Sequence, residues 1–159
     1  TMAAGRRITN RDCRYMVTRS EMKGLQGWFL NRLGCFPIDQ GRPSLTSLRY
    51  AVDLLTARQQ LVVFPEGKIN RFSDPIKLKK GLIRLAQLAS GKGLEIKIVP
   101  VGLAYSEVIP EICGSASICF SKPILISKKD KQSTNDFNIK LSKSMRSAEQ
   151  TALLAVGRG

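Results

Sequence analysis

Residues 64–71, which read Phe-Pro-Glu-Gly-Lys-Ile-Asn-Arg, combine side chains that suit a phosphate group. Pro65 fixes the backbone at the exit from an apolar run, and Gly67 lets the backbone approach a ligand closely. Lys68 adds a compact point charge, while Arg71 adds a two-pronged hydrogen-bond donor for phosphate oxygens. The segment predicts a phosphate-binding loop, and an ordinary solvated loop with basic residues stays open as the alternative.

The charge balance also points to an anionic partner. The chain has 26 Lys and Arg against 12 acidic residues, a net charge of +14, which favours a phosphorylated metabolite, a phospholipid surface or a nucleic acid. Aromatic residues make up only 6%, and no RNP, zinc-finger or KH-like signature occurs, which argues against nucleic acid. A Walker loop is excluded because no glycine precedes Gly67 at the required spacing and Ile69 replaces the magnesium-binding Ser or Thr.

The four cysteines offer no recognisable metal-binding spacing. They contain no CxxC pair, and because the chain lacks histidine a zinc site would need all four together. We expect no metal and read them as reduced thiols: Cys13, Cys35, Cys113 and Cys119. No apolar stretch approaches the roughly 20 residues of a spanning helix, so we expect a soluble or peripheral chain on the cytosolic side.

Apolar runs and helical periodicity alternate along the chain. Strands are predicted at 14–18, 35–38, 61–64, 96–104, 116–120 and 124–126. Helices are predicted at 21–33, from 44 to about 55, at 80–89 and from 133 or 134 onward. This alternation predicts an α/β fold with a largely parallel mixed sheet flanked by helices, in a single domain 1–159 whose C-terminal helical segment is 127–159. Ligands collect at the carboxyl ends of parallel strands, where the loop after 61–64 begins.

Two helices carry clear apolar stripes that predict which residues enter the core. For the helix from Ser44 the predicted stripe is Leu45, Leu48, Ala51, Val52 and Leu55. For the last helix it is Phe137, Leu141, Met145, Ala148 and Ala152.

The first predicted helix has two open interpretations. Trp28 and Phe29 lie between the basic residues Arg19, Lys23 and Arg32. Aromatic rings among basic side chains suit a lipid interface, where rings sit at the level of the headgroups. A Trp facing the core of an amphipathic helix is the alternative.

Three segments together resemble sequence blocks of the glycerolipid acyltransferase family. Residues 64–68 are similar to its third block, Phe-Pro-Glu-Gly followed by Thr-Arg or a variant. Residues 34–42, Gly-Cys-Phe-Pro-Ile-Asp-Gln-Gly-Arg, look like the second block, and 98–102, Ile-Val-Pro-Val-Gly, look like the fourth. The blocks occur in the family order and cover roughly residues 14 to 105.

The resemblance implies an enzyme of phospholipid synthesis. Such an enzyme moves a fatty acyl group from acyl-coenzyme A or acyl carrier protein to lysophosphatidic acid, giving phosphatidic acid, and needs no further cofactor. It would work on an anionic phospholipid membrane surface at the cytoplasmic face. The acceptor-phosphate site carried over onto this chain consists of Arg42, Glu66, Gly67, Lys68 and Arg71.

The chain departs from the family pattern in both basic positions. Lys68 and Ile69 stand where Thr-Arg is common, and Gln40 stands where arginine is common. Arg71 and Arg42 are the expected substitutes, each displaced by two positions.

The family's first block, a histidine followed five positions later by aspartate, has no counterpart here. The histidine takes the proton of the acceptor hydroxyl and the aspartate orients it. Arg7 and Asp12 share the spacing, but arginine cannot accept a proton at ordinary pH. We expect 1–159 to be an N-terminally truncated acyltransferase domain, inactive alone, with the catalytic pair upstream. A catalytically inactive lipid-binding homologue is the alternative.

The truncation hypothesis makes a prediction about the gene. An intact reading frame upstream of Thr1 should encode His-x-x-x-x-Asp within a few tens of residues. Sequencing that region tests it, and an intact frame without the motif would remove the enzyme interpretation.

Overall fold

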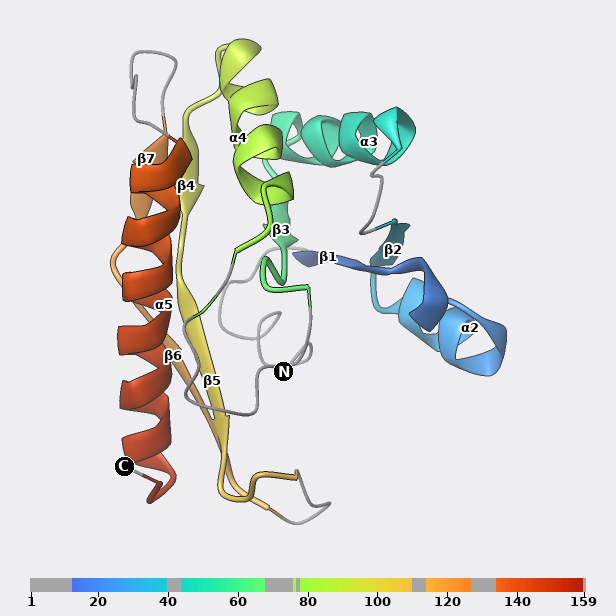
Figure 1. The fold of residues 1–159 in the computed structure, drawn as a ribbon. Coiled ribbons are helices and arrows are strands. Elements are labelled where there is room, and N and C mark those ends of the chain that lie inside the picture. Colours follow the sequence, from blue (N-terminus) through green and yellow to red (C-terminus); the bar gives the residue numbers. More distant parts are fainter. Residues whose placement is uncertain are drawn as a thin grey trace. The chain divides into compact units, whose positions relative to one another are not determined.

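The computed structural model describes residues 13–39, 44–67, 76, 78–109, 114–126 and 134–158 (Figure 1). Its elements are β1 (Cys13–Thr18), the short 3-10 helix η1 (Arg19–Glu21), α2 (Gly24–Arg32), β2 (Cys35–Ile38), α3 (Leu45–Thr56), β3 (Gln60–Val62), α4 (Gly81–Gly91), β4 (Ile96–Ile98), β5 (Val101–Tyr105), β6 (Ala116–Phe120), β7 (Ile124–Ile126) and α5 (Thr134–Ala155). The described residues separate into two compact units. The first comprises those up to Gly67 together with Lys79–Leu94, and the second comprises Ile76, Leu78 and those from Glu95 onward.

The first unit contains a parallel sheet of three strands in the order β2-β1-β3. The pairing is staggered, because β1 meets β2 from Tyr15 to Thr18 but meets β3 only from Cys13 to Tyr15. Tyr15 is therefore the one described position of β1 that pairs with both neighbours, and its side chain is buried. The predicted α/β class is confirmed, and parallel pairing holds for these three strands.

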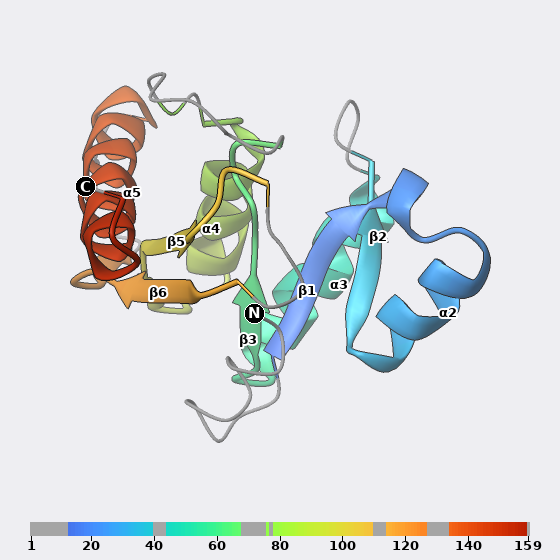
Figure 2. The same cartoon turned by 90° about the horizontal axis from the view of Figure 1, so that it is seen from below.

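The two crossover connections of this sheet run in opposite directions across it. The α2 crossover leads from β1 to β2, whereas the α3 crossover leads from β2 past β1 to β3. Figure 2 shows β1 and β2 side by side with α2 next to them. Because parallel crossovers are right-handed, opposite directions place α2 and α3 on opposite faces of the sheet. The strand order thus reverses at β1.

Helix α3 begins and packs for local reasons. The Ser44 hydroxyl accepts a hydrogen bond from the Ser47 amide at 3.1 Å and so caps the helix at its predicted start. The ring of Tyr50 meets that of Phe36 edge to face, with centroids 5.0 Å apart. The predicted stripe is wrong at its first member: Leu45 is 71% exposed, while Leu54 is buried. The buried stripe is rotated around the helix toward Leu54, which leaves the first turn outside it.

Helix α4 ends where the glycines predict. The Gly93 amide donates to the Ser90 carbonyl and the Leu94 amide donates to the Ala89 carbonyl, which satisfies the last carbonyls of the helix. Gly93 has φ +84°, a left-handed conformation that favours glycine.

The second unit contains two antiparallel strand pairs, β4 with β7 and β5 with β6. The prediction of one strand over 96–104 is wrong, because the chain forms β4 and β5 with Val99 and Pro100 between them. Pro100 has no amide hydrogen for a ladder, while its carbonyl accepts from the Ser121 amide at 2.9 Å. The single-domain organisation of 1–159 stays a prediction.

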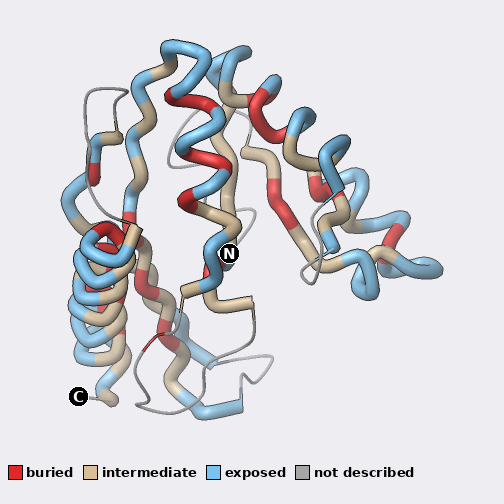
Figure 3. The backbone as a smooth tube through the Cα atoms, turned by 45° about the horizontal axis from the view of Figure 1, so that its top comes forward, coloured by how far each residue is buried: buried red, intermediate tan, exposed pale blue. Residues whose placement is uncertain are grey.

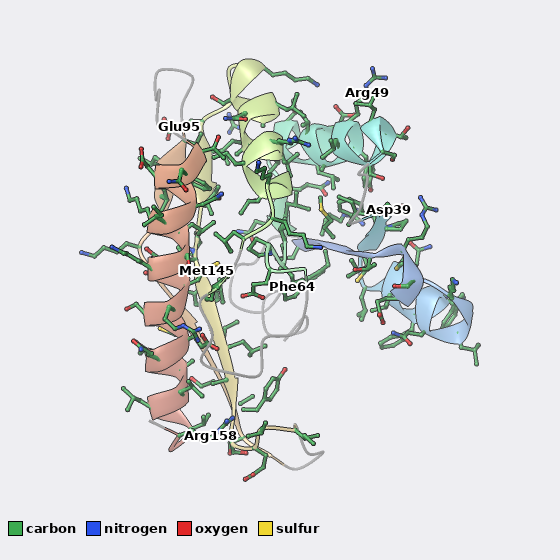
Figure 4. All side chains as sticks on the ribbon, in the orientation of Figure 1. Asp39, Arg49, Phe64, Glu95, Met145 and Arg158 are labelled. Carbon is green, nitrogen blue, oxygen red and sulfur yellow. The ribbon has the colours of Figure 1, made fainter. Side chains whose placement is uncertain are left out.

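Helix α5 covers the β5–β6 pair with its apolar stripe. Phe137, Leu141, Met145, Ala148 and Ala152 are all buried, which confirms the predicted stripe, and Figure 4 shows Met145 on the strand-facing side of the helix. The helix begins at Thr134, one of the two predicted caps, and the other, Ser133, lies outside the described residues. On β5, Gly102 and Ala104 alternate inward and are buried.

Gly102 sets how closely α5 approaches β5. A Cβ atom added at Gly102 would overlap the backbone of Ala148 and Glu149. We expect Gly102→Ala to lower the free energy of unfolding by about 2 kcal/mol through overpacking, measured by chemical denaturation. Gly91→Ala is the control, because a Cβ there meets nothing within 4 Å. Equal stabilities of the two variants would contradict this close packing.

Candidate functional site

The candidate site lies at the carboxyl edge of the parallel sheet. The three strands end there at Thr18, Ile38 and Val62, and parallel strands present their carboxyl ends to one edge. Asp39 follows β2, and the Phe64 segment follows β3 (Figure 4). The end of the second sequence block and the start of the third therefore lie on either side of β1, at the point where the strand order reverses. In open α/β sheets this point is the usual ligand site.

Residues Phe64 to Gly67 form a tight turn. The Gly67 amide donates to the Phe64 carbonyl at 3.2 Å, and Gly67 has φ +67°. Proline at the second position presets its φ, and glycine at the fourth accepts a left-handed conformation without a side-chain clash. Pro65 is buried and Glu66 is half-buried. The Pro-Glu-Gly sequence is therefore explained by backbone geometry before any ligand is considered.

The predicted strand 61–64 extends too far. β3 ends at Val62, and the Phe64 side chain is 53% exposed, so the last two predicted residues lie outside the strand. The Phe64 carbonyl is used by the turn and Pro65 has no amide to donate, so the ladder cannot continue. An exposed aromatic ring consequently stands at the start of the turn.

The N-terminus of α4 lies beside this turn. The Lys79 amide donates to the Pro65 carbonyl at 2.8 Å, and α4 begins two residues later at Gly81. The first amides of a helix have no partners within the helix and carry partial positive charge, so they attract anions. Lys80, at the cap position, is exposed. Turn and helix end together form an electropositive corner that suits a phosphate.

The structure describes two of the five predicted site residues. Glu66 and Gly67 lie in the turn, whereas Arg42, Lys68 and Arg71 lie outside the described residues. The grouping of all five around one phosphate stays a prediction.

One basic residue at this edge was not among the predicted site residues. Arg19 follows the last residue of β1 and is exposed, so its backbone stands at the carboxyl end of the central strand. The sequence marked Arg19 only as a neighbour of the aromatic helix. The position of Arg19 at the site follows from the strand order, which no local sequence pattern encodes.

The described part of the site holds no histidine that could act as a general base. The chain contains no histidine. Burial raises the pKa of the Cys35 thiol in β2, which keeps it protonated and unreactive at neutral pH. Among the described residues no cluster of metal-ligating side chains occurs. The arrangement is therefore suited to bind an anion.

None of the described helices is both long and apolar enough to cross a bilayer.

Comparison with known proteins gives a consistent family. The sequence model described as Acyltransferase matches residues 2–104. The chain is 32% identical over 76 residues to the 1-acyl-sn-glycerol-3-phosphate acyltransferase of Streptococcus pneumoniae (strain ATCC BAA-255 / R6), covering 47% of this chain and 25% of that protein. It is 32% identical over 62 residues to the protein of the same name from Bacillus subtilis (strain 168), covering 39% and 30%. Each match thus spans less than a third of the curated relative. No solved structure gives a significant match.

The left-handed conformation of Gly67 should tolerate a side chain poorly. Gly67→Ala should cost about 1–2 kcal/mol of stability through backbone strain. It should also weaken binding of inorganic phosphate or glycerol 3-phosphate, measured by titration calorimetry, because the turn beside α4 is distorted.

Gly157→Ala is the matched control for this variant. Gly157 shares a positive φ of +75° but follows α5 in the second unit. It should lose similar stability and keep phosphate binding, so equal phosphate affinities of the two variants would contradict the turn's role.

Proposed function

This chain belongs to the acyltransferase family, and from that premise we propose that it is part of an enzyme that acylates lysophosphatidic acid to phosphatidic acid. The observation that carries the proposal is the Phe64–Gly67 turn at the sheet edge, bonded through Pro65 to the start of α4. The names of the two bacterial relatives support the same acceptor, 1-acyl-sn-glycerol-3-phosphate.

We assign the acceptor phosphate to this corner of the first unit. The α4 amides and Lys80 provide positive potential, and Lys68, Arg71 and Arg42 are the proposed direct ligands. Glu66 does not bind the phosphate in this proposal, because two anions repel. We propose instead that its carboxylate, half-buried in the turn, attracts and orients the basic side chains of the loop.

The proposed reaction forms one bond and breaks one. The acceptor hydroxyl oxygen attacks the thioester carbonyl of acyl-coenzyme A or acyl carrier protein, so that a C–O bond forms and the C–S bond breaks. The hydroxyl proton passes to a histidine base and then to the departing thiolate. Because this chain has no histidine, that base belongs to a segment outside residues 1–159, and the chain alone should be inactive.

The proposed organisation and location follow from the same family. The match over residues 2–104 runs through β4 and most of β5, so it includes strands of both units and supports one acyltransferase domain. A net charge of +14 supports work at the cytoplasmic face of a membrane, where anionic lipids attract basic proteins.

A catalytically inactive lipid-binding homologue is the second candidate, and the absence of histidine favours it. The two functions differ in one measurement. The complete gene product should transfer labelled acyl chains to lysophosphatidic acid in the first case, and in the second it should bind the lipid without turnover.

The acceptor site is tested by kinetics of the complete gene product. Arg71→Ala should raise the KM for lysophosphatidic acid about tenfold, since it removes a charge-assisted hydrogen bond worth about 1.5–3 kcal/mol. Glu66→Ala should raise the same KM by a smaller factor. The KM for the acyl donor should stay unchanged in both.

Arg58→Ala is the matched control for these variants. Arg58 is exposed and lies between α3 and β3, at the opposite, amino edge of the sheet. Its removal should leave the KM for the acceptor unchanged, and an equal effect of Arg58 and Arg71 would contradict the proposed site.

A further inference from the structure

Helix α2 exposes its apolar side chains instead of burying them. Leu25 is 88% exposed, Trp28 59%, Phe29 57% and Leu33 36%. Figure 3 shows how little of α2 is buried, and Gly27 is its only buried residue. The alternative of a core-facing Trp28 is therefore wrong. We call Leu25, Trp28, Phe29 and Leu33 the apolar α2 face.

The spacing of these residues makes them one continuous surface. Positions 25, 29 and 33 are four residues apart and position 28 is three residues after 25, so they lie along one side of α2 and of its C-cap residue, Leu33. Gly27 lies on the opposite side, where an added Cβ would overlap the backbone of Met22. The helix packs against β2. The glycine side of α2 thus faces the protein and its apolar side faces outward, the reverse of an ordinary surface helix.

Basic residues flank the apolar α2 face in the sequence, and Arg32 contacts it. The Arg32 guanidinium lies over the Trp28 ring, 4.4 Å from its centroid. Lys23, at the N-terminal cap of α2, and Arg19 are exposed. Glu21 is the one acidic residue between Arg19 and Leu33, and it accepts a hydrogen bond from Gln26 at 3.1 Å. The rim is therefore positively charged.

We propose that the apolar α2 face docks onto the surface of an anionic phospholipid bilayer. Trp28 and Phe29 enter the interfacial layer, while Arg19, Lys23 and Arg32 meet lipid phosphates. The rim charge selects this occupant, because it complements anionic headgroups and the chain as a whole carries +14. A cation stacked on an indole also keeps its charge while covering apolar surface.

The placement of α2 connects this surface to the acceptor site. η1 follows the carboxyl end of β1, and α2 starts after it, so the apolar α2 face begins near the edge that holds the Phe64–Gly67 turn. This inference deepens the proposed function, because a lysophospholipid reaches an enzyme from a membrane. The inference rests on the proposed function only for the reason why the surface docks, since binding to a bilayer itself requires no turnover.

Trp28 is the only tryptophan in the chain and reports directly on docking. Vesicles of equal parts phosphatidylcholine and phosphatidylglycerol, added to the 159-residue chain, should shift Trp28 emission to the blue. Brominated lipid should quench that emission. Vesicles of phosphatidylcholine alone should bind more weakly, and added salt should weaken binding to the anionic vesicles.

Variants locate the surface. Phe29→Ala should weaken vesicle partitioning about tenfold, as should Trp28→Ala measured by co-sedimentation. Leu45→Ala is the matched control, because Leu45 is a 71% exposed leucine on α3, and it should partition like the unaltered chain. Both aromatic side chains are exposed, so these variants should fold normally.

Three outcomes would overturn the proposal. The first is a Trp28 emission that does not shift with anionic vesicles, and the second is equal partitioning of the Phe29→Ala and Leu45→Ala variants. The third is a dimer that forms without lipid and dissociates in Phe29→Ala, because such a dimer would assign the apolar α2 face to a second copy of the chain. Failure of the proposed function looks different. Vesicle binding would then persist while the complete gene product transferred no acyl group.

Discussion

The backbone pairing of β1 with strands on both sides is the constraint on which the first unit depends. β1 is short, and its stagger gives β3 the amino half of the strand and β2 the carboxyl half, with Tyr15 shared by both. Its residues Tyr15 and Met16 are buried by this central position. Because the next two strands lie on opposite sides of β1, the loops that follow them flank a single strand end. The candidate site is therefore a consequence of strand order.

At that position two backbone hydrogen bonds fix the Phe64–Gly67 turn and the start of α4. One hydrogen bond closes the turn and a second, from Lys79 to Pro65, fixes the start of α4 beside it. Neither bond involves a side chain, so substitutions among the basic residues leave this frame intact. The turn therefore does not depend on whether Lys-Ile or Thr-Arg follows it. The frame requires proline and glycine.

Sequence patterns predicted the features that depend on residues close together in the sequence. The α5 stripe is regular over five positions, from Phe137 to Ala152, and the structure buries every one. The Ser44 cap and the glycines after α4 act through neighbouring backbone groups, and they too were predictable. The block order in the chain likewise identified the family before any pairing was known.

The remaining features depend on partners distant in sequence, and there the patterns gave less. An apolar run does not reveal that Pro100 divides it, because the break depends on which strand pairs on each side. Helical periodicity gives a stripe but not its direction, so Leu45 was misplaced and the outward face of α2 stayed undecided. Arg19 lies at the edge of the candidate site only because the strand order reverses at β1.

Gly27 is the one buried residue of α2. A helix with large residues on one side and glycine on the other ordinarily buries the large side, since more apolar area then leaves water. In α2 the backbone of Met22 leaves no room for a Cβ at Gly27, and the side that carries Leu25, Trp28 and Phe29 is exposed. Exposing that much apolar surface costs stability in water, and the proposed docking at a lipid interface would remove that cost.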